Sequence, residues 1–186
     1  MFYHASSIPN LTKLTPYISN HNKPLVYFSQ KRENTLVYLN NAVQEFCKEN
    51  KIPVLDKIHK WASYGFNNHG ILVLDEYYPN ATRETYSGVS GYIYSVKPNK
   101  DIIPQDDIPF ASVTNKPVKI ESIEFIPDAF EELNRMAKRG LIILNRFENN
   151  STEKLNWIKR VIREEYNKHR DKPEYIAFLK AKFDFL

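Results

Sequence analysis

Phe2-Tyr3-His4-Ala5-Ser6-Ser7 is the stretch on which the fold assignment of this 186-residue chain depends. Its first residues are apolar and aromatic, and small residues follow the histidine. The sequence then becomes rich in Ser, Asn, Thr and Pro as far as Pro24. Short apolar runs that end in such residues are typical of β-strands. We therefore predict a strand that begins near residue 2 and carries His4 inside it or at its end.

A second buried strand is predicted over Leu25-Val26-Tyr27-Phe28-Ser29, which follows Pro24. Apolar residues at helical spacing then predict a helix over about 36–47, limited by Pro53. If the two strands are neighbours, the imidazole of His4 and the phenol of Tyr27 line one cleft. Taken alone, these residues favour a simpler interpretation, a half-buried histidine and a core tyrosine with satisfied hydrogen bonds.

The rest of the chain alternates between strand and helix patterns. The segment over about 54–84 has the least clear secondary-structure pattern. The other predicted segments are a strand over Gly91–Val96, a polar loop over 99–115, a strand over 118–126 that breaks near Ser122-Ile123, a helix over Ala129–Lys138 capped by Gly140, a strand over 141–144, a helix opened by a capping box of Asn150 and Glu153, and a helix after Pro173. We expect the helical tail, about 150–186, to pack on a single domain.

Composition excludes several classes of protein. The net charge is +4, from 26 basic and 22 acidic residues spread along the chain, which is weak for nucleic-acid binding. The basic residues of the tail are the one candidate for such binding, and a solvated helix face explains them as well. No apolar run reaches the roughly 20 residues of a membrane span, and no signal peptide is evident, so a soluble cytoplasmic protein is expected.

Familiar catalytic signatures are missing from the sequence. There is no glycine-rich phosphate loop, no nucleophile elbow and no histidine pair at metal-ligand spacing on a helix, so no metal is expected. The single cysteine, Cys47, lies on the apolar face of its predicted helix, as a small buried hydrophobe does. The remaining histidines are interpreted as solvated surface residues: His21, His59, His69 and His169.

The opening segment resembles the first motif of the ADP-ribosyltransferases, in which an aromatic-His-Gly-Ser/Thr run grips the nicotinamide riboside of NAD. The segment around Tyr27 is similar to their second motif. The chain resembles the rifamycin ADP-ribosyltransferase group in further features. These are a Gly-x-Ile-Tyr-x-Val-x-Pro strand (Gly91 to Pro98), an acidic loop with Asp106 and Asp107, a strand from Pro117 and a short helix. The resemblance covers much of residues 2–30 and 91–144, and it makes 50–85 an insertion.

This resemblance implies an α+β fold in which two small, twisted, mostly antiparallel sheets surround an NAD cleft. It implies that His4 binds a ribose hydroxyl of NAD, that Tyr27 stacks on the nicotinamide, and that Asp107 supplies the third catalytic group. Asp106 is the next candidate for this catalytic acid, and Asp101, Glu121 or Glu124 could also take the role. The other implied cofactor-binding residues are Tyr3, Ala5, Ser6 and Ser29. Ala5 departs from the glycine of the family, where the backbone approaches the ligand closely.

The expected activity is transfer of ADP-ribose from NAD to an unidentified small-molecule or macromolecular acceptor. The aromatic residues of the insertion, Trp61, Tyr64, Tyr77 and Tyr78, are candidates for acceptor recognition or for a structural cover over the sheet. The alternatives are a non-catalytic nucleotide- or partner-binding module of the same fold, and a basic nucleic-acid-binding protein. The catalytic acid distinguishes the transferase from the binding module, because NAD binding can survive loss of that acid and ADP-ribose transfer cannot.

Overall fold

The computed structural model describes residues 1–18, 23–54 and 58–186. Its helices are η1 (Glu33–Tyr38), α1 (Ala42–Glu49), α2 (Ala81–Tyr86), α3 (Ala129–Lys138), η2 (Phe147–Asn149), α4 (Thr152–Lys168) and α5 (Pro173–Lys182). Its strands are β1 (Phe2–Ser6), β2 (Lys13–Leu14), β3 (Tyr17–Ile18), β4 (Pro24–Ser29), β5 (Tyr64–Phe66), β6 (Leu72–Asp75), β7 (Gly91–Val96), β8 (Ile103–Pro104), β9 (Ala111–Thr114), β10 (Val118–Lys119), β11 (Ser122–Ile126) and β12 (Ile142–Asn145).

The largest sheet has the order β11-β7-β1-β4-β9-β8, with β3 paired to β4, and its pairs are antiparallel. Strand β1 pairs with β7 at five positions but with β4 only where Tyr3 opposes Ser29. The sheet therefore consists of two halves, β11-β7-β1 and β4-β9-β8, joined at one register pair. The coarse prediction of an α+β protein with antiparallel sheets is confirmed.

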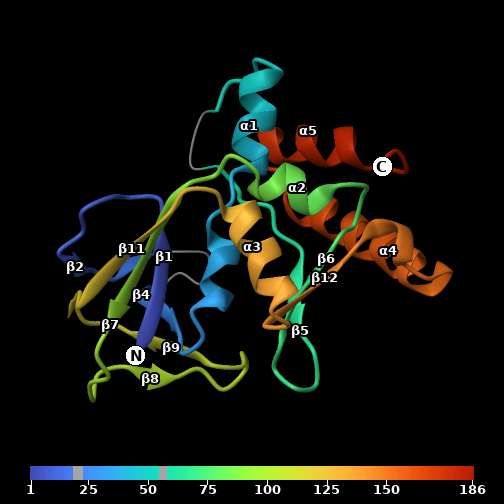
Figure 1. Ribbon diagram of the computed structural model, residues 1–186. Helices are drawn as coiled ribbons and strands as arrows, with labels where there is room; N and C mark the ends of the chain where they lie inside the picture. The colour runs from blue at the N-terminus through green and yellow to red at the C-terminus, as the bar shows by residue number, and fades with distance from the viewer. Residues whose placement is uncertain (19–22, 55–57) are drawn as a thin grey trace.

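One face of this sheet packs against η1, α3 and the three-stranded sheet β12-β6-β5, and Figure 1 shows α3 between the two sheets. Ala5 and Ile93 contribute to this first core cluster. Gly91, the first residue of β7, packs against Leu39, the residue that follows η1. A Cβ at that position would lie 2.5 Å from Leu39 Cδ2 and 3.1 Å from the Ser6 carbonyl oxygen, so a larger residue would displace the buried Leu39 side chain.

The opposite face is covered by short strands, and a separate helical core lies further along the chain. Val26, Phe28 and Tyr94 pack with β2 and β10 in a third cluster on that opposite face. The second cluster joins α1 to α4 and α5, the pair of helices at the right of Figure 1, and it includes Trp61 and Phe178. The C-terminal helices α4 and α5 thus pack against α1 and Trp61.

Several elements lie where the sequence pattern predicts them. The strand over Gly91–Val96 and the helix over Ala129–Lys138 have the predicted bounds, and Gly140 follows that helix with a φ of +70°. Strands β1, β4 and β12 agree within one or two residues. The strand predicted over 118–126 is divided at residues 120–121 rather than near Ser122-Ile123, which lie within β11, and its two parts belong to different sheets.

Other local predictions are wrong. The single helix over 36–47 is interrupted between η1 and α1, because Asn40 donates from its side chain to the Val37 carbonyl (2.7 Å) and the main-chain NH of Asn41 bonds Thr85 across the fold. The predicted loop over 99–115 contains the hairpin of β8 and β9. Ser151, rather than Asn150, caps α4, and the Asn150 side chain instead donates to the main-chain carbonyl of Glu76.

Candidate functional site

The segments predicted to form the site lie in neighbouring strands. Tyr3 of β1 opposes Ser29 of β4, and Ser29 opposes Ala111 of β9. The turn before β9, which carries Asp106 and Asp107, is fixed to the end of β4 by a bond from the Gln30 main-chain NH to the Phe110 carbonyl (2.9 Å). Because β7 flanks β1 on its other side, the segments of β1, β4, β7 and the acidic turn meet at one sheet, whereas the strand from Pro117 contains β10, which pairs with β2 in a separate sheet.

His4 is half-buried at the junction of the two halves of the sheet. Its Nδ1 lies 2.9 Å from the main-chain oxygen of Tyr27, and its ring meets the edge of Phe28 at 6.3 Å between centroids. A carbonyl oxygen only accepts, so Nδ1 carries the hydrogen and Nε2 of the neutral ring remains an acceptor. Burial lowers the pKa of His4, and the bond to Tyr27 opposes this in part. The ring is therefore neutral at neutral pH.

The phenol of Tyr27 points away from the imidazole of His4. Val26 and Phe28 enter the third cluster, and side chains alternate along a strand, so the Tyr27 ring lies on the other face of β4. There it is close enough to Tyr38 to contribute, after burial and Tyr64, to raising the pKa of the Tyr38 phenol. The structure thus joins His4 to the main chain of Tyr27, and the two rings occupy opposite faces of the strand.

The small residues around His4 organise the backbone. The buried Ala5 methyl belongs to the first cluster, on the face opposite to the His4 ring, so it does not obstruct a ligand beside the imidazole. Ser6 Oγ accepts from the main-chain NH of Ile8 (3.1 Å). Ser29 Oγ accepts from the main-chain NH of Lys31 (3.1 Å), and Tyr3 packs against the first cluster.

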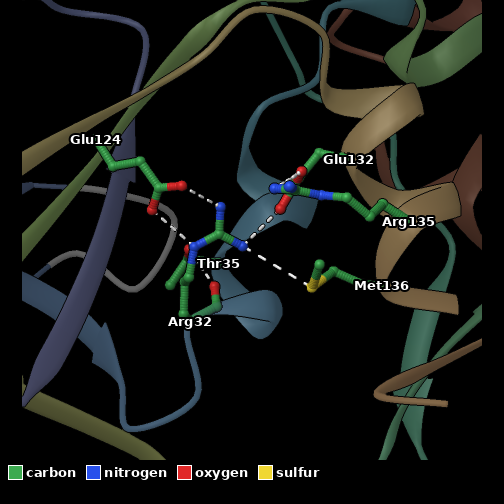
Figure 2. Close-up of polar contacts among 6 residues, drawn as sticks. All are labelled: Arg32, Thr35, Glu124, Glu132, Arg135 and Met136. Atoms are coloured by element: carbon green, nitrogen blue, oxygen red, sulfur yellow. Dashed lines mark hydrogen bonds and ion pairs between the residues drawn. The ribbon is translucent and has the colours of Figure 1, made fainter. Parts of the chain in front are cut away.

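Three of the five candidate acids are held in ion pairs. Asp101 accepts from Lys116 (3.0 Å) and Glu121 pairs with Lys97 (2.8 Å). Glu124 forms a two-point pair with Arg32, through Nε (2.7 Å) and Nη2 (2.6 Å), as Figure 2 shows.

Asp106 and Asp107 differ from those three acids. Both are exposed in the turn before β9, and neither makes a hydrogen bond or ion pair with any residue that the structure describes. They are the two candidate acids whose carboxylates are available to a ligand.

The insertion over 50–85 reaches the acidic turn through the hairpin of β5 and β6. Gly70 in that hairpin has a φ of +69°, and a Cβ added there would lie 2.9 Å from the Phe110 ring. Lys31 lies over the same ring, with Nζ 4.1 Å from its centroid. The tip of the insertion therefore contacts the turn that carries Asp106 and Asp107.

Two histidines expected on the surface lie together instead, and that expectation is wrong for them. The rings of His59 and His169 are 4.4 Å apart between centroids, and His59 is 4.3 Å from Tyr175. Both are half-buried, and burial followed by the charge of His169 lowers the pKa of His59 to about 4. His69 is exposed as expected, whereas His21 lies outside the described residues.

A cavity of about 270 Å³ adjoins this histidine pair. Among the residues that line it are His59, Trp61, Tyr64, Tyr77, Glu165 and Tyr175. Trp61 and Tyr78 are buried in the second cluster, so the aromatic residues of the insertion cover the core and also border the cavity.

Several basic residues of the tail are engaged within the chain. Lys154 pairs with Asp75 (2.9 Å), and Lys159 and Arg163 lie over the ring of Phe185. These contacts favour a structural role for them over a nucleic-acid interface. Among the described residues, none of the helices combines the length and apolar character of a membrane span.

No family model, no curated protein and no solved structure matches this chain.

Proposed function

We propose that the chain is an NAD-binding, ADP-ribosyltransferase-like protein that transfers ADP-ribose to an unidentified acceptor. The observation that supports this most is the adjacency of the segments that carry the resemblance: β1 with His4, β4 with Tyr27 and the turn with Asp107 follow one another across the sheet. These segments are separated along the chain, so their adjacency is an independent argument beyond the sequence motifs.

The state of His4 suits a ribose ligand. With Nδ1 donating to the main chain of Tyr27, the neutral ring offers Nε2 to a ribose hydroxyl, which donates to it. A hydrogen bond of fixed direction orients the sugar for reaction. Tyr27 holds His4 through its main-chain carbonyl, and because its ring lies on the other face of β4, its part in this proposal is to position the imidazole rather than to stack on the nicotinamide.

The carboxylate of Asp107, or of Asp106, supplies the electrostatic part of the proposed reaction. Breaking the bond between nicotinamide and ribose develops positive charge on the sugar, and a fixed anion stabilises that charge. The same carboxylate accepts the proton of an acceptor hydroxyl as the new bond to ribose forms. Both candidates are free of ion pairs with described residues, so neither must leave a partner first.

Calorimetry with NAD tests the binding step. We expect the native chain to bind NAD and His4→Ala to weaken binding by roughly tenfold or more through loss of one oriented hydrogen bond. Tyr27→Ala keeps the main-chain carbonyl that holds His4, so it should weaken binding less. His69→Ala, at an exposed histidine, is the matched control and should bind as the native chain does. Absence of NAD binding by the native chain, or native affinity in both His4→Ala and Tyr27→Ala, contradicts the proposal.

A non-catalytic nucleotide-binding module is the second candidate, and the exposure of Asp106 and Asp107 favours it. No described residue orients either carboxylate, whereas catalytic groups are held in position. Incubation with labelled NAD and a cell lysate distinguishes the two. Transfer that Asp107→Asn and Asp106→Asn together abolish, with NAD binding preserved, indicates an enzyme. Binding without any transfer indicates the module.

A further inference from the structure

We propose that His59, Glu165 and His169 form a binding site for a divalent transition-metal ion of the zinc type. The proposal is independent of NAD binding, because it concerns a different part of the molecule. Each of the three residues offers one ligand atom, and these atoms all lie within 4.8 Å of one another. In a tetrahedral zinc site, ligand atoms about 2.1 Å from the ion lie roughly 3.4 Å from one another. The three side chains must therefore move closer together when the ion binds.

The donor set selects the class of metal. Two imidazoles and one carboxylate suit zinc and its transition-metal neighbours, whereas magnesium and calcium prefer sites made entirely of oxygen ligands. Two histidines and one glutamate are also among the ligand sets of catalytic zinc sites, in which a fourth position is left open.

His169 is already oriented as a ligand. Its Nδ1 lies 3.1 Å from the main-chain oxygen of Glu165 and 3.2 Å from that residue's Oε2. Since the main-chain oxygen only accepts, Nδ1 carries the hydrogen and Nε2 is left for a metal, so the Glu165 carboxylate must turn from the Nδ1 side of the ring to share that ion. Metal-binding histidines are commonly held by such a second hydrogen bond. Glu165 and His169 lie four residues apart at the end of α4, so both face the same side of the helix.

His59 completes the site from a distant segment. Its ring contacts those of His169 and Tyr175 at tilted angles of 47° and 44°, which places it beside the two helix residues. His59 and Glu165 also line the cavity of about 270 Å³, so a bound ion would keep an open position toward that space. A water molecule or a small anionic ligand fits such a position.

The charges around the site act in both directions. Lys168 and Lys172 are near enough to disfavour positive charge on His59, and Asp171 has the opposite effect. Glu165 contributes one negative charge inside the site itself. The expected affinity is therefore lower than that of a site with two carboxylates and no neighbouring lysines.

Titration of the full chain with zinc ions alone tests the proposal, and cobalt(II), whose visible absorption reports tetrahedral coordination, provides a second measurement. We expect one ion per chain, a raised melting temperature, and a loss of affinity of roughly tenfold or more in His59→Gln and in His169→Gln. Glu165→Gln should weaken binding while far-UV circular dichroism stays native. Magnesium should have no effect.

His69→Gln is the matched control, because His69 is an exposed histidine outside the cluster, and it should bind zinc as the native chain does. The glutamine variants keep the bulk of the side chain, so we expect them to fold. Circular dichroism recognises a variant that does not, and His59→Asn or His169→Asn then replaces it. Failure of the native chain to bind zinc, or native affinity in a folded His59 and His169 double variant, overturns the proposal.

Discussion

At the scale of single residues, the environment of His4 determines its chemistry more than its identity does. Burial removes water that would solvate an imidazolium, so the pKa of His4 lies below the usual 6.5. The bond to the Tyr27 carbonyl fixes which nitrogen carries the hydrogen. A neutral ring in one tautomer is the form that can accept from a ribose hydroxyl, which links the local electrostatics to the proposed role.

The lowered pKa of His4 predicts how stability depends on pH. The unfolded chain takes up a proton on this histidine as pH falls through 6.5, whereas the folded chain resists until a lower pH. Folding stability contributed by the neutral ring is therefore complete above pH 6.5 and decreases below it. We expect His4→Gln to lose less unfolding free energy than the native chain between pH 7 and pH 5, measured by urea denaturation. Equal losses would contradict this.

At the scale of elements, Arg32 connects three of them. It precedes η1 and binds Glu124 of β11 on one side and Glu132 of α3 on the other, the latter at 2.7 Å through Nη1 (Figure 2). Arg135 also reaches Glu132, from the next turn of α3. The side chain of Glu132 is only 8% exposed, so its charge depends on these two arginines for compensation.

Removing Arg32 should therefore destabilise the fold more than removing an exposed partner does. We expect Arg32→Met to lower the free energy of unfolding by about 2 to 3 kcal/mol, because Glu132 then keeps only the exposed Arg135. The exposed pair of Lys97 and Glu121 provides the control, and Lys97→Met should change stability by less than about 1 kcal/mol. Guanidinium denaturation measures both, and equal effects would contradict the role of the network.

At the scale of the whole molecule, the helical tail packs against α1 and the insertion. Phe178 of α5 packs with Trp61 of the insertion and Phe46 of α1, at ring-centroid distances of 5.8 and 5.7 Å. Glu76, 2% exposed, accepts from Arg146 and from the main-chain NH of Thr82, which ties the chain before α4 to the start of α2. We infer one cooperative unit, because no element of the second cluster buries its apolar face alone.

This inference predicts the outcome of truncating a buried ring. Phe178→Ala should lower the free energy of unfolding by about 3 to 4 kcal/mol through the lost apolar contact and the cavity left behind. Tryptophan fluorescence and far-UV circular dichroism should report one coincident transition. Phe125→Ala, at a phenylalanine that is 54% exposed, is the matched control and should change stability by about 0.5 kcal/mol or less. Separate melting of the tail would contradict a single unit.

The site could be anticipated only in part. Local patterns placed His4, Tyr27 and the two aspartates on a first strand, a second strand and the segment that follows β7, because strand periodicity is a property of neighbouring residues. No sequence pattern predicts the ion pair between Arg32 and Glu124, which engages that candidate acid. The pairing of His59 with His169 was also missed. Its one local sign was the four-residue spacing of Glu165 and His169 near the end of a predicted helix.

The sequence by itself determined the elements whose causes are local: the strand over Gly91–Val96, the helix over Ala129–Lys138 and its glycine cap. Tertiary structure decided which of them meet. In the folded chain the Tyr27 and His4 rings lie on opposite faces of β4, and the helix predicted over 36–47 is interrupted at Asn40. His59 contacts His169 at the end of α4. The reason is physical. Periodicity and caps depend on residues within a few positions, whereas strand partners, tautomers and side-chain clusters depend on contacts between segments far apart in the chain.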